Sequence, residues 1–185
     1  MDIQFSAEPA VQLLTQYPKQ VQRATVRALN RALTTGKATV ARLVAKDMGL
    51  QVGVVKDAIK VTKANASRLQ IQLRASLRLL PLIHFGARQT AHGVTYNLGR
   101  GRSRIPNAFI ATVKGPLPSG VVSPGHTGVF VRVGKKRLPI TQRYGPSIGH
   151  VFIKHQDAGI AQMRETFDKN FAHELEFAKT EGTGA

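Results

Sequence analysis

The side chains able to do acid–base, nucleophilic or metal chemistry are few, and their spacing suits none of these. Cysteine is absent, which excludes thiol nucleophiles, disulfides and cysteine-ligated zinc. A catalytic carboxylate pair needs two positioned acids, yet Asp57 is the only acid between residues 51 and 145. No phosphate-cradling or dinucleotide-binding glycine motif is present. No metal-ligand spacing joins the histidines at positions 84, 92, 126, 150 and 155. The sequence therefore predicts no catalytic residue, no metal and no cofactor.

Positive charge is the strongest chemical signal. The chain has 27 Lys and Arg against 10 Asp and Glu, a formal net charge of +17. Residues 51–145 hold 16 of these cations and one acid, whereas residues 146–185 hold 4 cations and 6 acids. A surface so one-sided repels itself and gains from contact with something anionic. Nucleic acid and an acidic face on a protein neighbour would both serve.

Two basic clusters lie in this segment. In 99–104 three arginines alternate with small residues, so that guanidinium forks can reach phosphate or carboxylate oxygens. The second cluster lies in 135–137, with a further arginine at 143. Either cluster alone suits a solvated hairpin turn equally well. Together they predict contact with an anionic surface, through Arg100, Arg102, Arg104, Lys135, Lys136, Arg137 and Arg143. No sequence-reading motif accompanies them, so any nucleic-acid contact should be with phosphates and salt-sensitive.

The elements that must position these clusters follow from periodicity. After Pro18, apolar residues recur at three- and four-residue steps to Val44, as one face of a long helix requires. Gly36 is a predicted bend. Alternation of apolar and polar residues in 69–74 and 92–98 predicts strands. A Gly/Pro-rich stretch, 114–127, predicts an irregular loop, and helical spacing returns from 155.

This order predicts an α+β chain. We expect a long N-terminal helix, a central antiparallel β-sheet with a long Gly/Pro loop, and a C-terminal helix packed on the sheet. No signal-peptide pattern or apolar run of about 18 residues occurs, so we expect synthesis in a cytoplasm and no membrane contact. The expected organisation is a single domain, 1–185, with an N-terminal arm (1–17), a helical part (18–60), a β-rich part (61–148) and a C-terminal helix (150–180).

Three groups of segments resemble the minor tail protein Z family of long-tailed bacteriophages such as lambda. The first is a basic helix at 27–32 that leads into 40–42 and 54–64. The second is 80–86 followed by 104–110, and the third is 137–140 followed by 144–147. Their order and spacing cover about residues 20–175, and together they carry the resemblance. The motif positions are Pro81, Ile105, Pro106, Phe109, Leu138, Pro139, Tyr144, Gly145, Pro146 and Ser147.

The resemblance implies a non-enzymatic virion protein, made in the host bacterial cytoplasm, that completes the tail and helps join it to the head. It also implies a ring of copies, expected to be six, around the DNA path. Implied partners are further copies, tail terminator or tube proteins, head-connector proteins, and DNA in the lumen through its phosphates. The acidic C-terminal helix is a candidate patch for a neighbour's basic loop. The alternative is a free-standing, non-sequence-specific nucleic-acid-binding protein, which explains the charge but not the proline-marked motifs.

Overall fold

The longest element is helix α2 (Pro18–Met48), in which alanine, leucine and arginine favour helical backbone. The computed structural model describes residues 2–6, 18–114 and 125–182. Along α2 the buried positions form one stripe, represented by Val21, Leu29 and Val44. The helix runs without interruption through the glycine at which a bend was expected.

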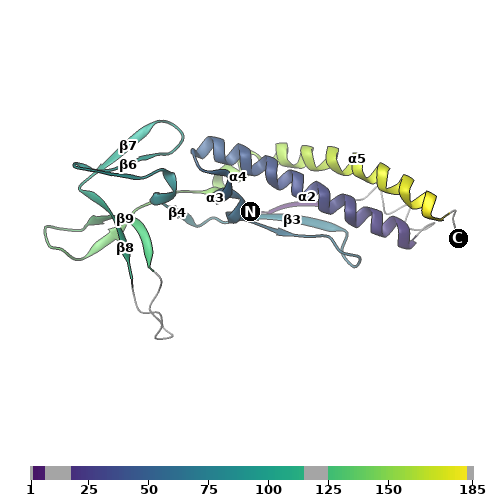
Figure 1. The fold of residues 1–185 in the computed structure, drawn as a ribbon, viewed down its shortest axis with the longest axis horizontal. Helices are drawn as coiled ribbons and strands as arrows, with labels where there is room; N and C mark the ends of the chain where they lie inside the picture. Colours follow the sequence, from purple (N-terminus) through teal and green to yellow (C-terminus); the bar gives the residue numbers. More distant parts are fainter. Residues whose placement is uncertain (1, 7–17, 115–124, 183–185) are drawn as a thin grey trace.

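A second long helix, α5 (Gln156–Gly182), lies antiparallel to α2 along its length (Figure 1). Two glycines permit the close approach of the helices. A Cβ on Gly36 would lie 2.3 Å from Met163 Cγ, and a Cβ on Gly159 would lie 2.4 Å from Val40 Cγ2. Gly36 is therefore a packing position between two helices.

Gly159→Ala should destabilise the chain, because the added methyl group meets a stiff, fully buried valine. Overpacking of this kind costs about 1–3 kcal/mol, against a gain of about 1 kcal/mol from helix propensity. Gly53→Ala is the matched control: it lies in helix α3 (Val52–Ala58), with no atom within 4 Å of its added Cβ. Thermal unfolding should show a lower Tm for the first variant and an equal or higher one for the second. Equal shifts would contradict this account of the helix pair.

A three-stranded antiparallel sheet lies beside the helix pair. Its order is β1 (Asp2–Ser6), β3 (Gln70–Ala75) and β2 (Ile59–Thr62). Within the N-terminal arm expected over 1–17, Asp2–Ser6 forms a strand that pairs with β3 along its whole length; residues 7–17 lie outside the described part. The predicted helical segment ends early, because Ile59, a β-branched residue, begins a strand with its side chain buried.

The remaining strands form a β-rich end on the far side of the molecule from the C-terminus (Figure 1). The central sheet expected from the sequence is divided into small antiparallel sheets. One has the order β5-β6-β7, another β10-β9-β8, and a two-stranded sheet pairs β11 with β4. Their bounds are β4 (Leu79–Pro81), β5 (Arg88–Thr90), β6 (Gly93–Asn97), β7 (Arg102–Pro106), β8 (Ala108–Val113), β9 (His126–Arg132), β10 (Ile140–Gln142) and β11 (Tyr144–Ser147), with a 3-10 turn η1 (Leu82–Phe85) after β4 and helix α4 (Ile148–Lys154) after β11.

The α+β class with a long helix at each end of the chain is confirmed. Two details differ from expectation. The C-terminal helix packs chiefly along α2 and also contacts β1, where the Phe5 and Phe167 ring centroids are 5.7 Å apart. The expected Gly/Pro loop is shorter on its second side, because β9 already begins at His126; residues 115–124 lie outside the described part.

A polar contact fixes the junction of α2, α4 and α5. Asp47 Oδ2 accepts hydrogen bonds from Lys154 Nζ at 3.0 Å and His155 Nε2 at 2.9 Å. The hydrogen bond from His155, and then that from Lys154, lower the pKa of the Asp47 carboxyl below its ordinary value of 3.8. A carboxyl with a lowered pKa in the folded state stabilises the fold above its unfolded-state pKa, and loses this contribution as pH falls through the folded-state pKa.

Asp47→Asn should therefore be less stable than the parent chain near neutral pH. The difference in Tm should shrink as pH falls below 3.8, because protonation then removes the same charge from the parent. Thermal unfolding of both chains across the acid range measures this. A gap that stays constant into strong acid would show that Asp47 does not act through its ionised form.

Candidate interface for an anionic partner

The first basic cluster lies on the hairpin formed by β6 and β7, in which Val94 faces Ile105 and Tyr96 faces Ser103. The turn of this hairpin rests against the end of α2. A Cβ on Gly99 would lie 2.5 Å from the Asp47 carbonyl oxygen, and Gly99 has a φ of +84°. Only glycine satisfies both requirements at once. The contact holds the turn, and Arg100 with it, beside the helical end.

Two arginines of this hairpin, Arg102 and Arg104 of β7, lie on the same face. Successive side chains of a strand point to opposite faces, so Arg102 and Arg104 lie on the face opposite Ile105. Both arginines are exposed, and Arg102 Nη1 donates a hydrogen bond to Thr95 Oγ1 at 3.3 Å. The hairpin thus has one cationic face and one apolar face.

The second cluster, Lys135, Lys136 and Arg137, occupies the turn between β9 and β10, and all three side chains are exposed. A hydrogen bond from a side chain to the backbone closes this turn: Arg132 Nη1 donates to the carbonyl oxygen of Arg137 at 2.7 Å. Figure 1 places this turn at the extremity of the β-rich end, away from the β6–β7 turn beside α2. The two predicted clusters therefore do not merge into one patch.

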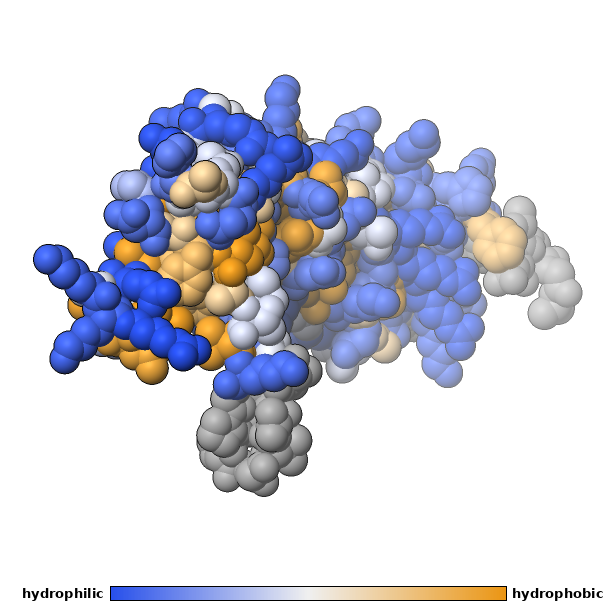
Figure 2. All heavy atoms as spheres, turned by 60° about the vertical axis from the view of Figure 1, so that its left-hand side comes forward, coloured by the Kyte–Doolittle hydropathy of each residue, from blue (hydrophilic) through white to orange (hydrophobic). Residues whose placement is uncertain are grey.

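An apolar groove lies between the β6–β7 hairpin and β11, with a volume of about 390 Å³. Figure 2 shows apolar surface on the β-rich end, bordered by hydrophilic side chains. Two of the three motif groups of the family resemblance supply lining residues, from distant parts of the sequence. The lining residues are Leu82, Tyr96, Leu98, Ile105, Arg143, Tyr144, Gly145 and Pro146.

The floor of the groove depends on a tight contact. Tyr144 pairs with Pro81, which brings β11 alongside β4. A Cβ on Gly145 would lie 2.4 Å from Cε2 of Phe85, a fully buried ring. The Tyr-Gly-Pro motif thus has a physical reason: glycine lets β11 close over Phe85 and leaves Tyr144 at the surface.

Tyr144 is the most prominent side chain of the groove. Its side chain is 49% exposed, and its hydroxyl donates to Gln142 Oε1 at 3.0 Å. The Gln142 amide nitrogen lies 2.6 Å from His126 Nε2. The ring is therefore fixed by its hydroxyl while part of its surface stays accessible.

Several predicted motif residues have structural surroundings outside the groove. Phe109 packs beside Phe130 with ring centroids 6.2 Å apart, and the Arg132 guanidinium lies over the Phe109 ring at 5.2 Å. Ser147 is buried and lies 2.7 Å from His150 Nδ1. The other three are Pro106 at the end of β7 and Leu138 and Pro139 in the β9–β10 turn.

The β-rich end has no negative charge of its own. Its sequence contains no acid between Asp57 and Asp157. Among the described residues, no ion pair joins a carboxylate to any of the seven predicted contact cations. The ion pairs between described residues lie between α2 and α5, between β1 and β3, and at the junction of α2, α4 and α5. Positive charge on this surface is thus uncompensated within the described chain.

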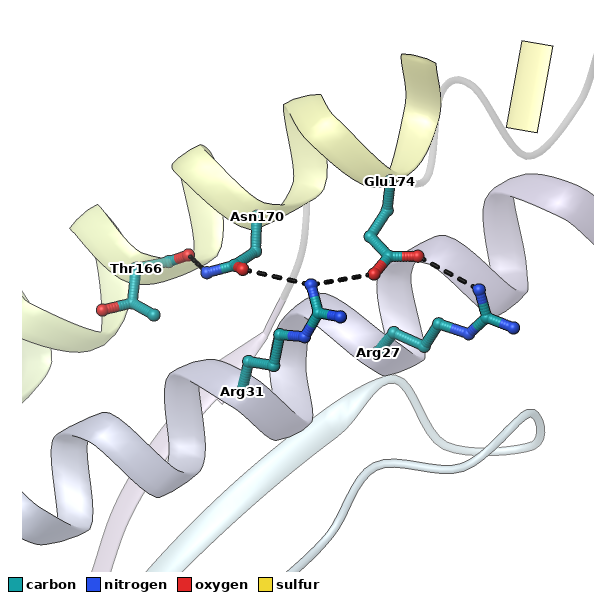
Figure 3. A network of polar contacts seen from close by, with 5 residues as sticks. All are labelled: Arg27, Arg31, Thr166, Asn170 and Glu174. Atoms are coloured by element: carbon teal, nitrogen blue, oxygen red, sulfur yellow. Dashed lines mark hydrogen bonds and ion pairs between the residues drawn. The ribbon is translucent and has the colours of Figure 1, made fainter. Parts of the chain in front are cut away.

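The sequence suggested that the acids of the C-terminal helix form a patch for a neighbour's basic loop. The structure does not leave Glu174 of α5 free for that role. Glu174 is only 6% exposed and faces α2, where its carboxylate oxygens lie 3.2 Å from Arg27 Nη1 and 2.9 Å from Arg31 Nη1 (Figure 3). Arg31 also donates to Asn170 Oδ1 at 3.3 Å. Glu174 therefore joins the two helices and is not available to a neighbouring subunit, whereas Glu165 and Asp168 are exposed. The four-residue spacing of Arg27 and Arg31, which places both on one side of α2, is the feature of the sequence that could have indicated this contact.

The described residues show neither a cluster of metal ligands nor a membrane-spanning helix. They contain no group of three or more His, Cys, Asp or Glu placed to hold a metal ion. In the same ranges, no helix combines the length and the apolar character needed to cross a membrane.

The structure thus combines an α+β scaffold with an apolar groove among cations that have no carboxylate partner in the described chain. The model of the prophage minor tail protein Z (GPZ) family matches residues 6–179, and the chain belongs to this family. The chain is thus a bacteriophage minor tail protein, a component of the virion. No curated protein and no solved structure matches it.

Proposed function

We propose that the chain is a tail-completion protein of the neck, at the head-proximal end of the tail, where it helps join the tail to the head around the DNA path. It acts by binding, without catalysis. Membership of the minor tail protein family supports a structural role in the tail. The observation that supports the neck position is the acid-free β-rich end, because a surface of one charge sign gains from contact with an anionic partner, and the DNA path through the neck offers one.

The copies form a ring, which we propose to have six members. The chain is elongated, with helices at one end and small sheets at the other (Figure 1). Contacts between unlike surfaces of identical subunits close into a ring when the rotation allows. The ring meets tail terminator or tube proteins on one side and head-connector proteins on the other.

The seven predicted cations face the anionic partner in this arrangement. Where they face DNA in the lumen, the contacts are with phosphates and carry no base specificity. Where they face protein, the charge pairs with acidic neighbours orient the partners and speed their association more than they raise the affinity. Both kinds of contact weaken as salt concentration rises.

Electron microscopy of lysates from a phage lacking this gene tests the proposal. We expect filled heads and separate tails, with joining restored by the gene supplied in trans. Gold-labelled antibody against the chain should mark the head–tail junction of complete particles. Label along the tube or at the distal tip, or normal joining without the gene, would contradict the neck position.

The family match favours a virion component over the free-standing nucleic-acid-binding protein. The two also differ in DNA affinity. A tail protein should bind free duplex DNA only weakly at physiological salt, whereas a dedicated binder should hold it there with a steep salt slope. Tight binding of free DNA by the purified chain would revive the alternative.

A further inference from the structure

The groove between β11 and the β6–β7 hairpin has the composition of a protein-binding site. Aromatic side chains and arginine are enriched at the centre of protein interfaces, and tyrosine and arginine dominate their binding energy. Tyr96, Tyr144 and Arg143 line this groove together with aliphatic side chains. Its volume of about 390 Å³ is at the low end of the roughly 300–1,000 Å³ of ligand sites, which is enough for apolar side chains of a docked segment.

Charge identifies what kind of segment fits. Arg143 lines the groove, and Arg100 follows the lining residue Leu98 by two positions. No acid occurs in the sequence between Asp57 and Asp157, so the strands and turns that line the groove carry no carboxylate. A complementary partner must supply the carboxylates.

Duplex DNA meets only half of this requirement. Its phosphates suit arginine, but its backbone offers no apolar group to fill a groove lined by Leu82, Ile105 and Pro146. A second copy of the chain is also a poor match for this particular groove, since it offers few carboxylates, with 10 Asp and Glu against 27 Lys and Arg. The buried Glu174 is already used within its own subunit.

We propose that this groove is the docking site for an acidic segment of a different protein, which seats an apolar side chain against Tyr144 and pairs its carboxylates with Arg143 and the neighbouring cations. The inference rests on the proposed function for the identification of that protein as a neighbour in the tail or neck. Binding to purified components tests the groove itself. The docking proposal can therefore fail while the proposed function stands, and the proposed function can fail while the docking proposal stands.

The test uses the purified full-length chain and three fluorescent probes: a random copolymer of glutamate and tyrosine, polyglutamate of the same length, and duplex DNA. Ionic strength is raised to about twice the physiological value to weaken purely electrostatic binding. The copolymer should then bind at least about tenfold more tightly than either of the other probes, a difference of about 1.4 kcal/mol.

Tyr144→Ala should abolish the preference for the copolymer, whereas Tyr144→Phe should keep it. Arg143→Gln should weaken binding of both polypeptides. Val61→Ala is the matched control, an exposed apolar residue of β2 that does not line the groove. Thermal unfolding checks that each variant folds. Leu98→Asn replaces Tyr144→Ala if that variant is unfolded.

Equal binding of copolymer and polyglutamate would overturn the inference, as would tighter binding of duplex DNA. Sedimentation of the chain alone tests whether a second copy of the chain occupies the groove. Self-association should be the same for the parent and for Tyr144→Ala; if the substitution removes it, the groove holds a second copy and the inference is wrong.

Discussion

Glu174→Lys should lower the free energy of unfolding by about 3–5 kcal/mol, the cost of breaking a buried ion pair so that a buried charge is left uncompensated. The side chain is 6% exposed and lies between two arginines of α2. Lysine would place a third cation in this site with no carboxylate left. Thermal unfolding should show a Tm lower by roughly 6–20 °C for a chain of this length.

Glu174→Leu separates the charge effect from packing. Leucine leaves no buried charge, and Arg27 and Arg31, with side chains 59% and 54% exposed, can hydrate in place of the lost contact. We expect this variant to lose no more than about 1 kcal/mol, the scale of exposed pairs. A lysine variant as stable as the leucine variant would show that the ion pairs of Figure 3 do not hold the helices together.

Reversal of the charges of the β9–β10 turn should sharply reduce the yield of joined particles. Lys135, Lys136 and Arg137 are exposed, and the contact that closes the turn uses the backbone carbonyl of Arg137, so glutamate at all three positions should leave the fold intact. At about 1 kcal/mol for each exposed pair, the loss is about 3 kcal/mol, or roughly a hundredfold in the docking constant.

The matched control reverses three other cations by the same amount. Lys56, Lys60 and Lys63 are equally exposed but lie at and beside α3 and β2, outside the predicted contact set. Particle counts by electron microscopy and infectious titre measure both triple variants. The control should assemble as the parent does; an equal loss in both would mean that total charge matters and not the β9–β10 turn.

Periodicity predicted the two long helices because their packing partners repeat on one face. Val21 to Val44 form a continuous stripe, and so do the apolar residues of the last helix. The same pattern does not indicate which element packs against the apolar stripe. The contact of α5 with α2 depends on Gly36 and Gly159, whose role shows only when the facing side chains are known.

Short elements were harder to predict because their pairing is non-local. Asp2–Ser6 has five residues and becomes a strand by pairing with β3, more than sixty positions away. Helix α3 and β2 are separated by no loop, so periodicity gave no boundary between Ala58 and Ile59.

The candidate interface was partly visible in the sequence. The cationic residues were found directly from composition and spacing, since exposure of lysine and arginine is the rule. The groove was not, because Leu82, Leu98 and Tyr144 look like ordinary core or turn residues until β11 pairs with β4. The motif positions pointed to it only through the family resemblance.

The central claim is that the acid-free β-rich end lies against a negatively charged partner at the head–tail junction. An electron cryomicroscopy reconstruction of the junction in intact particles tests it most directly. We expect density for this chain in the neck, with the β9–β10 turn and Arg143 facing carboxylates or phosphates. Density for the chain elsewhere in the particle, or these side chains in open solvent, would contradict it.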